Sequence, residues 1–229
     1  MVTLAVKRNR VGPVMGRHPW VFSQAFINIP DGLPWGEPVR LKSEDGRFLG
    51  LGYFNSYSQI AVRLWGYDEG EDVNEEFFRG RIGRAYDLRR KYVESPGTNA
   101  YRLINGESDL LPGLIVDKYS EYLVIQFHTR GIERWKKEIV AGLESVIHPK
   151  GIYDRSDGAV RKIDGLREAS GLLAGAVPDL VTMKENGFLF LVDVKRGQKT
   201  GFFLDQRDKR QAFMKYTRGA DVLNCFSYT

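Results

Sequence analysis

The stretch Asp221-Val222-Leu223-Asn224-Cys225-Phe226-Ser227-Tyr228-Thr229 decides the predicted fold, because a short apolar run passes directly into small polar residues. Such a run predicts a buried strand that leads into a loop, and ligand sites of α/β domains lie outside the carboxyl ends of strands. Upstream, residues 199–208 lead into a predicted helix that closes near Gly219. The order of loop, helix and strand predicts the opening of an α/β domain that is interrupted before its ligand site is complete.

Residues 1–70 have a different pattern, in which short alternating stretches are separated by turn residues. Polar and apolar side chains alternate over residues 60–65, and Asp31-Gly32 marks a turn between strands. Closely spaced strands with glycine and aspartate between them predict a small β-barrel.

A helix and a second folded unit follow the predicted barrel. Residues 72–92 show helical periodicity, with acids near the start and bases towards the end, as the helix dipole favours. Pro96-Gly97 closes this helix. The other elements predicted for a compact α+β unit are a hairpin at 114–116 and 122–127, an amphipathic helix over 132–146, and strands near 152–153 and 188–192.

Six blocks of sequence together resemble one family of enzymes. The blocks are Arg17-His18-Pro19-Trp20-Val21-Phe22, Tyr101-Arg102-Leu103-Ile104-Asn105-Gly106-Glu107-Ser108-Asp109, Leu111-Pro112-Gly113, Tyr153-Asp154-Arg155-Ser156-Asp157, Thr200-Gly201-Phe202-Phe203-Leu204-Asp205-Gln206-Arg207 and Val222-Leu223-Asn224-Cys225-Phe226-Ser227-Tyr228-Thr229. In this order they resemble the bacterial 23S rRNA cytosine-C5 methyltransferases of the RlmI/YccW type. The resemblance covers the whole chain and implies an RNA-contacting PUA domain, a central domain and a class I S-adenosylmethionine-dependent methyltransferase domain.

The fold implied by the resemblance and the patterns is a mixed α/β multi-domain protein. We expect a PUA-like β-barrel over 1–70, a connecting helix over 71–97, a central α+β domain over 98–196, and over 197–229 the truncated start of a Rossmann-like methyltransferase domain. The implied function is cytosine-C5 methylation of 23S rRNA by the whole enzyme, with this portion inactive alone. The alternatives are a non-catalytic RNA-binding module, a guanine-modifying relative, and an orphaned folding fragment.

Charge and composition agree with an RNA partner. The net charge is +5 and the isoelectric point about 9.2, and the excess is +2 over residues 1–70 and +3 over 199–229. A basic excess favours a polyanionic partner such as large-subunit ribosomal RNA. A single cysteine and the lack of a long apolar stretch favour the cytoplasm without a membrane partner. The three histidines have no metal-site spacing, and a homodimer is left open.

The first predicted barrel contains the main candidates for RNA contact. Lys7 and Arg8 lie near the cluster of Arg17 and His18 in sequence, and basic groups hold phosphate while bases stack on aromatic or guanidinium planes. Trp20 is expected to be buried in the barrel instead. Three further candidates come later in the sequence. Arg155 and Arg161 could line the RNA path, although Asp154 and Asp157 offer structural partners for them, and Arg207 has a structural alternative in ion pairing at the start of its helix.

The cofactor residues are assigned through the resemblance. The start of the first methyltransferase motif, together with one polar side chain at the preceding helix, implies an S-adenosylmethionine site made of Gln206, Phe226, Ser227, Tyr228 and Thr229. The glycines that follow in the family, and that would let the backbone approach the ligand, lie beyond this sequence.

Cytosine-C5 methylation requires a cysteine thiolate that adds to C6 of the base and activates C5. Cys225 lies within the predicted buried strand, where a small packed side chain is the favoured interpretation. The resemblance implies that the nucleophile belongs to a later segment. No residue of this chain is therefore assigned as catalytic.

Overall fold

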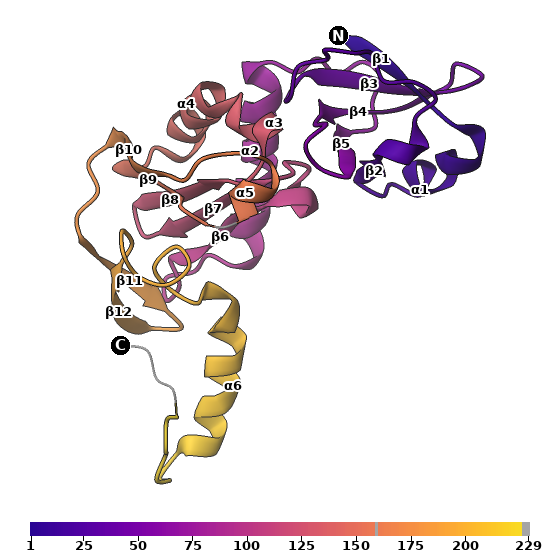
Figure 1. Ribbon diagram of the computed structural model, residues 1–229. Coiled ribbons are helices and arrows are strands. Elements are labelled where there is room, and N and C mark those ends of the chain that lie inside the picture. Colours follow the sequence, from indigo (N-terminus) through magenta and orange to yellow (C-terminus); the bar gives the residue numbers. More distant parts are fainter. Residues whose placement is uncertain (159, 226–229) are drawn as a thin grey trace.

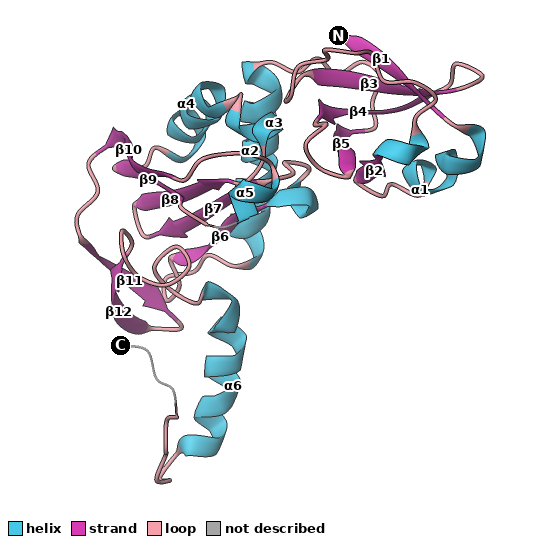
Figure 2. Cartoon of the chain, viewed as in Figure 1, coloured by secondary structure: helices cyan, strands magenta, loops and turns pink. Residues whose placement is uncertain are grey.

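The computed structural model describes residues 1–158 and 160–225, which fold around two five-stranded sheets (Figure 1). A two-stranded hairpin and a final helix follow the second sheet (Figure 2). The predicted mixed α/β fold class is confirmed.

The first sheet has the strand order β1-β3-β4-β5-β2. β1 and β3 pair in parallel and the other neighbours are antiparallel. One face is apolar because alternate residues of each strand point inward, and the short helix α1 (Val11–Met15) contributes Val14 to the same buried cluster. The strands are β1 (Val2–Val6), β2 (Trp20–Phe22), β3 (Pro38–Ser43), β4 (Phe48–Phe54) and β5 (Ile60–Gly66).

The second sheet has the order β10-β9-β8-β7-β6. β8 and β9 are parallel, and α3 (Arg130–Glu133) and α4 (Lys136–Ile147) form the crossover between them. The long helix α2 (Glu75–Tyr92) begins at Asn74, whose side chain accepts a hydrogen bond from the backbone N–H of Phe77. The strands are β6 (Ala100–Asn105), β7 (Leu114–Tyr119), β8 (Tyr122–Phe127), β9 (Gly151–Ser156) and β10 (Ala169–Gly175), and the short helix α5 (Val160–Ile163) lies between the last two.

Each face of the second sheet is covered. α2 and α4 contribute Phe78 and Leu143 to a buried cluster that includes Ile125 of β8. A separate cluster joins Val124 of β8 to Met183 of the hairpin that follows. The first cluster also takes in residues of β4 and β5, so the two five-stranded sheets share one core.

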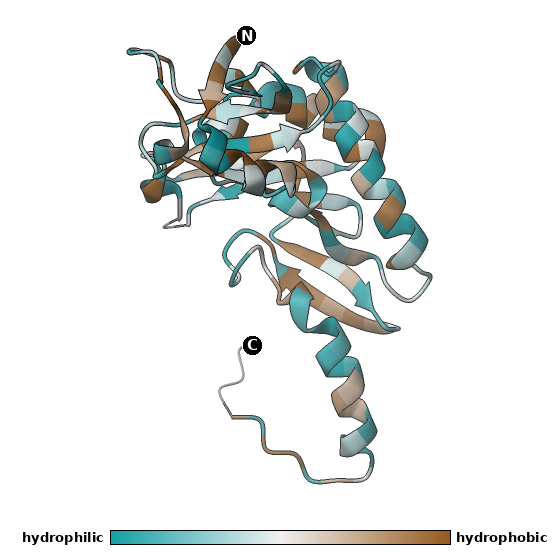
Figure 3. Ribbon diagram, turned by 90° about the vertical axis from the view of Figure 1, so that its right-hand side faces the viewer, coloured by the Kyte–Doolittle hydropathy of each residue, from teal (hydrophilic) through white to brown (hydrophobic). Residues whose placement is uncertain are grey.

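The hairpin consists of β11 (Leu180–Glu185) and β12 (Phe188–Asp193), which pair only with each other among the described strands. The strand predicted near 188–192 is therefore present but lies outside the central sheet. A 3-10 turn (Leu204–Gln206) leads into α6 (Arg207–Thr217). In Figure 3 the hairpin lies next to the second sheet and α6 extends away from both sheets.

The strand predicted from Asp221 onward is wrong for the residues that the structure describes. Residues 221–225 lie outside any strand, and Cys225 is exposed rather than packed. The physical reason is that a strand is stabilised by hydrogen bonds to a neighbouring strand, and within the described ranges no strand pairs with these residues.

Candidate functional site

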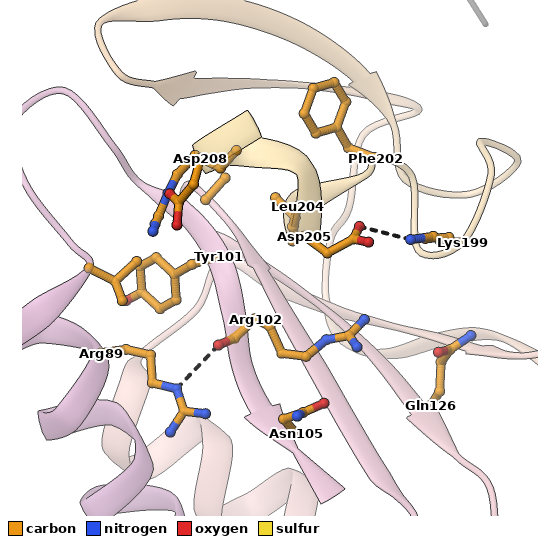
Figure 4. A pocket seen from close by; sticks show the side chains of 13 residues that line it. Arg89, Tyr101, Arg102, Asn105, Gln126, Lys199, Phe202, Leu204, Asp205 and Asp208 are labelled. Atoms are coloured by element: carbon orange, nitrogen blue, oxygen red, sulfur yellow. Dashed lines mark hydrogen bonds and ion pairs between the residues drawn. The ribbon is translucent and has the colours of Figure 1, made fainter. Parts of the chain in front are cut away.

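A cleft of about 600 Å³ lies between β6, the C-terminal part of α2 and residues 199–208 (Figure 4). Cationic, amide and aromatic side chains line it together. The lining residues are Arg89, Val93, Ala100, Tyr101, Arg102, Asn105, Gln126, Lys199, Phe202, Leu204, Asp205, Arg207 and Asp208.

Asp117 of β7 fixes the floor of this cleft. Its carboxylate accepts two hydrogen bonds from the guanidinium of Arg102, at 2.9 and 3.0 Å, and a third from Thr200 Oγ1 at 2.6 Å. The hydrogen bonds to Asp117 raise the pKa of Arg102 above its ordinary value. Because the Arg102 side chain is 40% exposed while that of Asp117 is 1% exposed, a positively charged group is presented to the cleft in a fixed position.

A second ion pair shapes the side of the cleft formed by α2. Arg89 Nη1 and Nη2 donate to the carboxylate of Asp109 at 2.5 and 2.8 Å. The same carboxylate accepts from the backbone N–H of Asn105 at 2.7 Å, and Arg89 Nε donates to the carbonyl of Arg102. These bonds hold the end of β6 against α2, so the amide of Asn105 has a defined place in the cleft wall.

Residues 199–208 close the cleft from the other side. Lys199 Nζ pairs with Asp205 Oδ1 at 2.8 Å, which lowers the pKa of Asp205. Phe202 lies against Phe190 of β12, with 5.0 Å between ring centroids, and the guanidinium of Arg210 lies 4.5 Å from the centre of the Phe202 ring. The arrangement combines cations, amides and an aromatic ring, which are the groups that bind phosphates and bases of single-stranded nucleic acid.

Two predicted residues belong to this part of the molecule. Arg207 lines the cleft, and its Nε donates to Asp208 Oδ1 at 3.0 Å. Gln206 precedes it in the 3-10 turn, where its amide donates to Asp205 Oδ2 at 3.3 Å.

The predicted cofactor site is largely outside the described residues. Phe226, Ser227, Tyr228 and Thr229 all lie there, so only Gln206 of the five has a described position. Its amide donates to Asp205, and the assignment of these residues to S-adenosylmethionine stays a prediction. Within those residues, no group of three or more histidine, cysteine, aspartate or glutamate side chains could hold a metal ion.

The four RNA candidates of the first sheet do not line the cleft. Lys7 Nζ donates to the carbonyl of Gln24 at 3.0 Å, and the exposed Arg8 borders a separate cavity. Arg17 and His18 are exposed in the loop after α1, and the Arg17 guanidinium lies 5.5 Å from the Tyr67 ring centroid. These side chains remain accessible to a partner.

The expectation that Trp20 is buried is wrong. The side chain is 38% exposed, and its Nε1–H donates to Glu107 Oε1 at 2.8 Å. Trp20 lies on an edge strand of three residues in which only Val21 points into the core. The ring thus joins the first sheet to the turn after β6.

The structure contradicts an RNA contact by Arg155, which is buried. Its guanidinium pairs with Asp157 at 2.9 Å and donates to the carbonyls of Val194 and Gly197. Arg161, a further candidate for the RNA path, is also buried and pairs with Glu133 at 2.7 Å. Buried arginines with these internal partners hold the fold together and are not available to a ligand.

Sequence reasoning missed Arg102, Asn105 and Gln126 as parts of a site. The first two lie within the block 101–109, where they supported only the family resemblance. Strand parity offered a signal for Arg102, because it alternates with the apolar Tyr101 and Leu103. Its partner Asp117 follows from the register of β6 and β7, which pairs the two residues.

Two structural features define the class of this protein: a first unit with a PUA-like fold and a second α/β unit beside it. Residues 4–66 match the family model of the PUA-like domain. The fold is similar to that of "a putative sam-dependent methyltransferase from Streptococcus mutans", with a TM-score of 0.79 and 25% identity, over 95% of this chain and 55% of that one.

Two curated relatives are more similar to this chain in sequence than that structure is. The chain is 43% identical over 216 residues, 94% of its length, to the ribosomal RNA large subunit methyltransferase I of Pseudoalteromonas atlantica. It is 41% identical over its full length to the protein of the same name from Aeromonas salmonicida. The resemblance predicted from the motifs is thereby confirmed. The chain spans 55% and 58% of the length of these two relatives.

No helix among residues 1–158 and 160–225 is both long enough and apolar enough to cross a membrane.

Proposed function

We propose that this chain forms the RNA-binding part of an S-adenosylmethionine-dependent enzyme that methylates large-subunit ribosomal RNA. The observation that carries the proposal is the identity of 41–43%, over at least 94% of this chain, to proteins named as large-subunit rRNA methyltransferases. The cleft supports the proposal because cations, amides and an aromatic ring line it beside Asp205 and Asp208, and cations, amides and aromatic rings are of the kind that bind single-stranded RNA.

The proposed target atom is C5 of a cytosine in 23S rRNA, and the proposed methyl donor is S-adenosylmethionine. When bound, this cofactor supplies an electrophilic methyl group. The role proposed for the described residues is to bind and orient RNA, with Arg102, Lys199 and Arg207 attracting phosphate and Asn105 and Gln126 bonding to base edges. The divisions at 1–70, 71–97, 98–196 and 197–229, and a cytoplasmic location, belong to the same proposal.

Binding of RNA by the chain tests the role of the cleft. The measurement is the affinity for a labelled large-subunit rRNA fragment over a series of salt concentrations. In Arg207→Gln we expect the slope of log K against log salt to fall by about 0.7, because one phosphate contact to a single strand is lost. Lys215→Gln is the matched control, because Lys215 is an exposed cation on the same helix that does not line the cleft. Equal slopes for both variants would exclude the cleft as the RNA site.

The target base is tested in cells of the source organism that lack the gene. Mass spectrometry of nucleosides from the large-subunit rRNA should show the loss of one 5-methylcytosine. Loss of a methylguanosine instead would identify the chain as part of a guanine-modifying relative. An unchanged set of methylated nucleosides would refute methylation of this RNA.

A further inference from the structure

Two exposed aromatic rings face a cavity on the first sheet, away from the cleft beside Arg102. Trp35 precedes β3 and is 44% exposed, and Tyr57 lies in the loop between β4 and β5 and is 56% exposed. Their ring centroids are 5.9 Å apart at an interplanar angle of 68°. Both rings line the cavity, of about 690 Å³. Large aromatic side chains are usually buried, so two of them exposed in one cavity indicate a binding surface.

The backbone around these rings is held in place. Trp35 Nε1 donates to Ser56 Oγ at 2.5 Å, and the backbone N–H of Tyr57 donates to the buried Asn55 Oδ1 at 2.9 Å. Gly36 has φ +77°, and a Cβ there would lie 3.0 Å from the carbonyl oxygen of Arg130. A fixed pair of rings loses little conformational freedom when a ligand stacks on it.

A cation from the second unit lies against the Trp35 ring, next to the cavity. The guanidinium of Arg130 lies 4.1 Å from the centre of the Trp35 ring, and it donates to the carbonyls of Asp164 and Gly165. A Cβ at Gly165 would lie 2.8 Å from Arg130 Nη2 and 3.4 Å from the ring of Tyr57, so both rings and the cation meet there. Within the described part of the chain, Arg130 forms no ion pair with a carboxylate side chain. Arg130 does not line the cavity itself, and its Nη1, which makes no hydrogen bond among the described residues, is the group offered to an anion.

We propose that Trp35 and Tyr57 form a stacking site for one unpaired RNA base, with Arg130 bound to an adjacent phosphate. Unpaired bases stack on aromatic and guanidinium planes, whereas bases inside a double helix are inaccessible to such a platform. Hydrogen-bonding groups for a base edge are present on the cavity wall in Asp31, Ser58 and Gln59. The proposal rests on the proposed function in one respect, namely that the chain binds RNA.

The position of the site connects it with the predicted RNA cluster. Ser58 lines both this cavity and a neighbouring one of about 310 Å³ whose wall includes Trp20. Trp20 stands two positions after His18, in the same sequence block that was singled out for RNA contact. A single strand bound at Tyr57 therefore has a short path to that block.

The test measures binding of the whole chain to a fluorescein-labelled single-stranded oligocytidylate. Tyr57→Ala should weaken binding about tenfold, within the range observed for loss of one base stack. Tyr57→Phe keeps the ring and should bind as the unchanged chain does. Tyr216→Ala is the matched control, because Tyr216 is an aromatic residue with 80% exposure on α6 that lines neither cavity. In Arg130→Gln the salt slope should fall by about 0.7, as expected for one phosphate contact.

The outcomes separate this inference from the proposed function. If the unchanged chain binds RNA and Tyr57→Ala binds equally well, the stacking site is refuted while the cleft and the methylation proposal stand. Equal affinity for a duplex of the same length would also refute it. If the unchanged chain binds no RNA at all, the proposed function fails together with this inference. Thermal unfolding of each variant shows whether the fold is retained. If Arg130→Gln is unstable, the comparison of Tyr57→Ala with Tyr57→Phe still tests the stacking site.

Discussion

The second sheet meets the first sheet and the C-terminal segment in different ways. At the first boundary, Tyr53 and Trp65 of the first sheet lie in one buried cluster with Phe78 of α2. Gly131 of α3 lies so close to Tyr53 that a Cβ there would be 2.1 Å from the ring. Arg63 and the buried Asp164 add an ion pair at 3.4 Å. Apolar packing and polar bonds together make this boundary part of the core.

The boundary with residues 199–217 depends on fewer contacts. Thr200 donates to Asp117, and Arg210 forms a bidentate pair with Glu185 at 2.6 Å. α6 has no buried residue. The first two units should therefore unfold as one, because they share a buried apolar core. The C-terminal segment, which adds only the partly buried Phe202 and Leu204 to an apolar cluster, should be loosened by loss of one polar anchor.

The largest expected effect tests the shared core. Trp65→Ala removes a fully buried ring that contacts Tyr53, Phe77 and Phe78, and it should lower the free energy of unfolding by about 3–5 kcal/mol. Urea denaturation followed by circular dichroism measures this loss. Leu223→Ala, at a residue with 87% exposure, should change stability by less than about 0.5 kcal/mol. Two separate unfolding transitions in the unchanged chain would contradict a shared core.

A smaller, local effect is expected at the polar anchor. Thr200→Val removes the hydroxyl that donates to Asp117 and accepts from the buried hydroxyl of Tyr119 at 2.8 Å. Asp117 keeps its bonds from Arg102, but a buried donor left without its acceptor costs about 1–3 kcal/mol. Hydrogen exchange should become faster in residues 199–217 and stay unchanged in β7 and β8. Thr200→Ser keeps the hydroxyl and should preserve the protection. Faster exchange across the whole second sheet would show that the segment is not a separate unit.

The same contrast explains which elements were predictable from the sequence. Helix 72–92 and the hairpin of 114–116 and 122–127 were predicted and are observed as α2 and as β7 with β8. Their periodicity is local and is reinforced by neighbours close in sequence. The strand expected from Asp221 failed because a strand requires a partner that the local pattern cannot supply.

Site residues were harder to predict, because exposure depends on distant partners. Arg102 and Arg155 both lie on strands of the second sheet, yet Arg102 faces the cleft while Arg155 is enclosed by carbonyls from residues 194 and 197. Trp20 finds its acceptor, Glu107, 87 positions along the chain. Nothing within a local stretch of sequence distinguishes these environments.

The smallest expected effect concerns pH at the first boundary. Burial lowers the pKa of His128 below its ordinary value of 6.5, and the charge of Arg161 lowers it further. The unfolded chain therefore takes up this proton at a higher pH than the folded chain. The contribution of His128 to stability is fully present above pH 6.5 and is lost as the pH falls through its folded pKa, by at most about 1.4 kcal/mol per pH unit.

His128→Asn should therefore reduce the loss of stability between about pH 8 and about pH 5, measured by urea denaturation at each pH. His148→Asn is the control, because His148 is exposed at the end of α4 with φ +52°, a conformation that asparagine tolerates. If both variants keep the pH dependence of the unchanged chain, protonation of His128 does not destabilise the boundary. Trp20 of the first sheet and Glu107, in the turn after β6, line the same cavity as His128. If the pH dependence of stability is reduced in His128→Asn and not in His148→Asn, the acid-sensitive part of the fold lies between the two sheets.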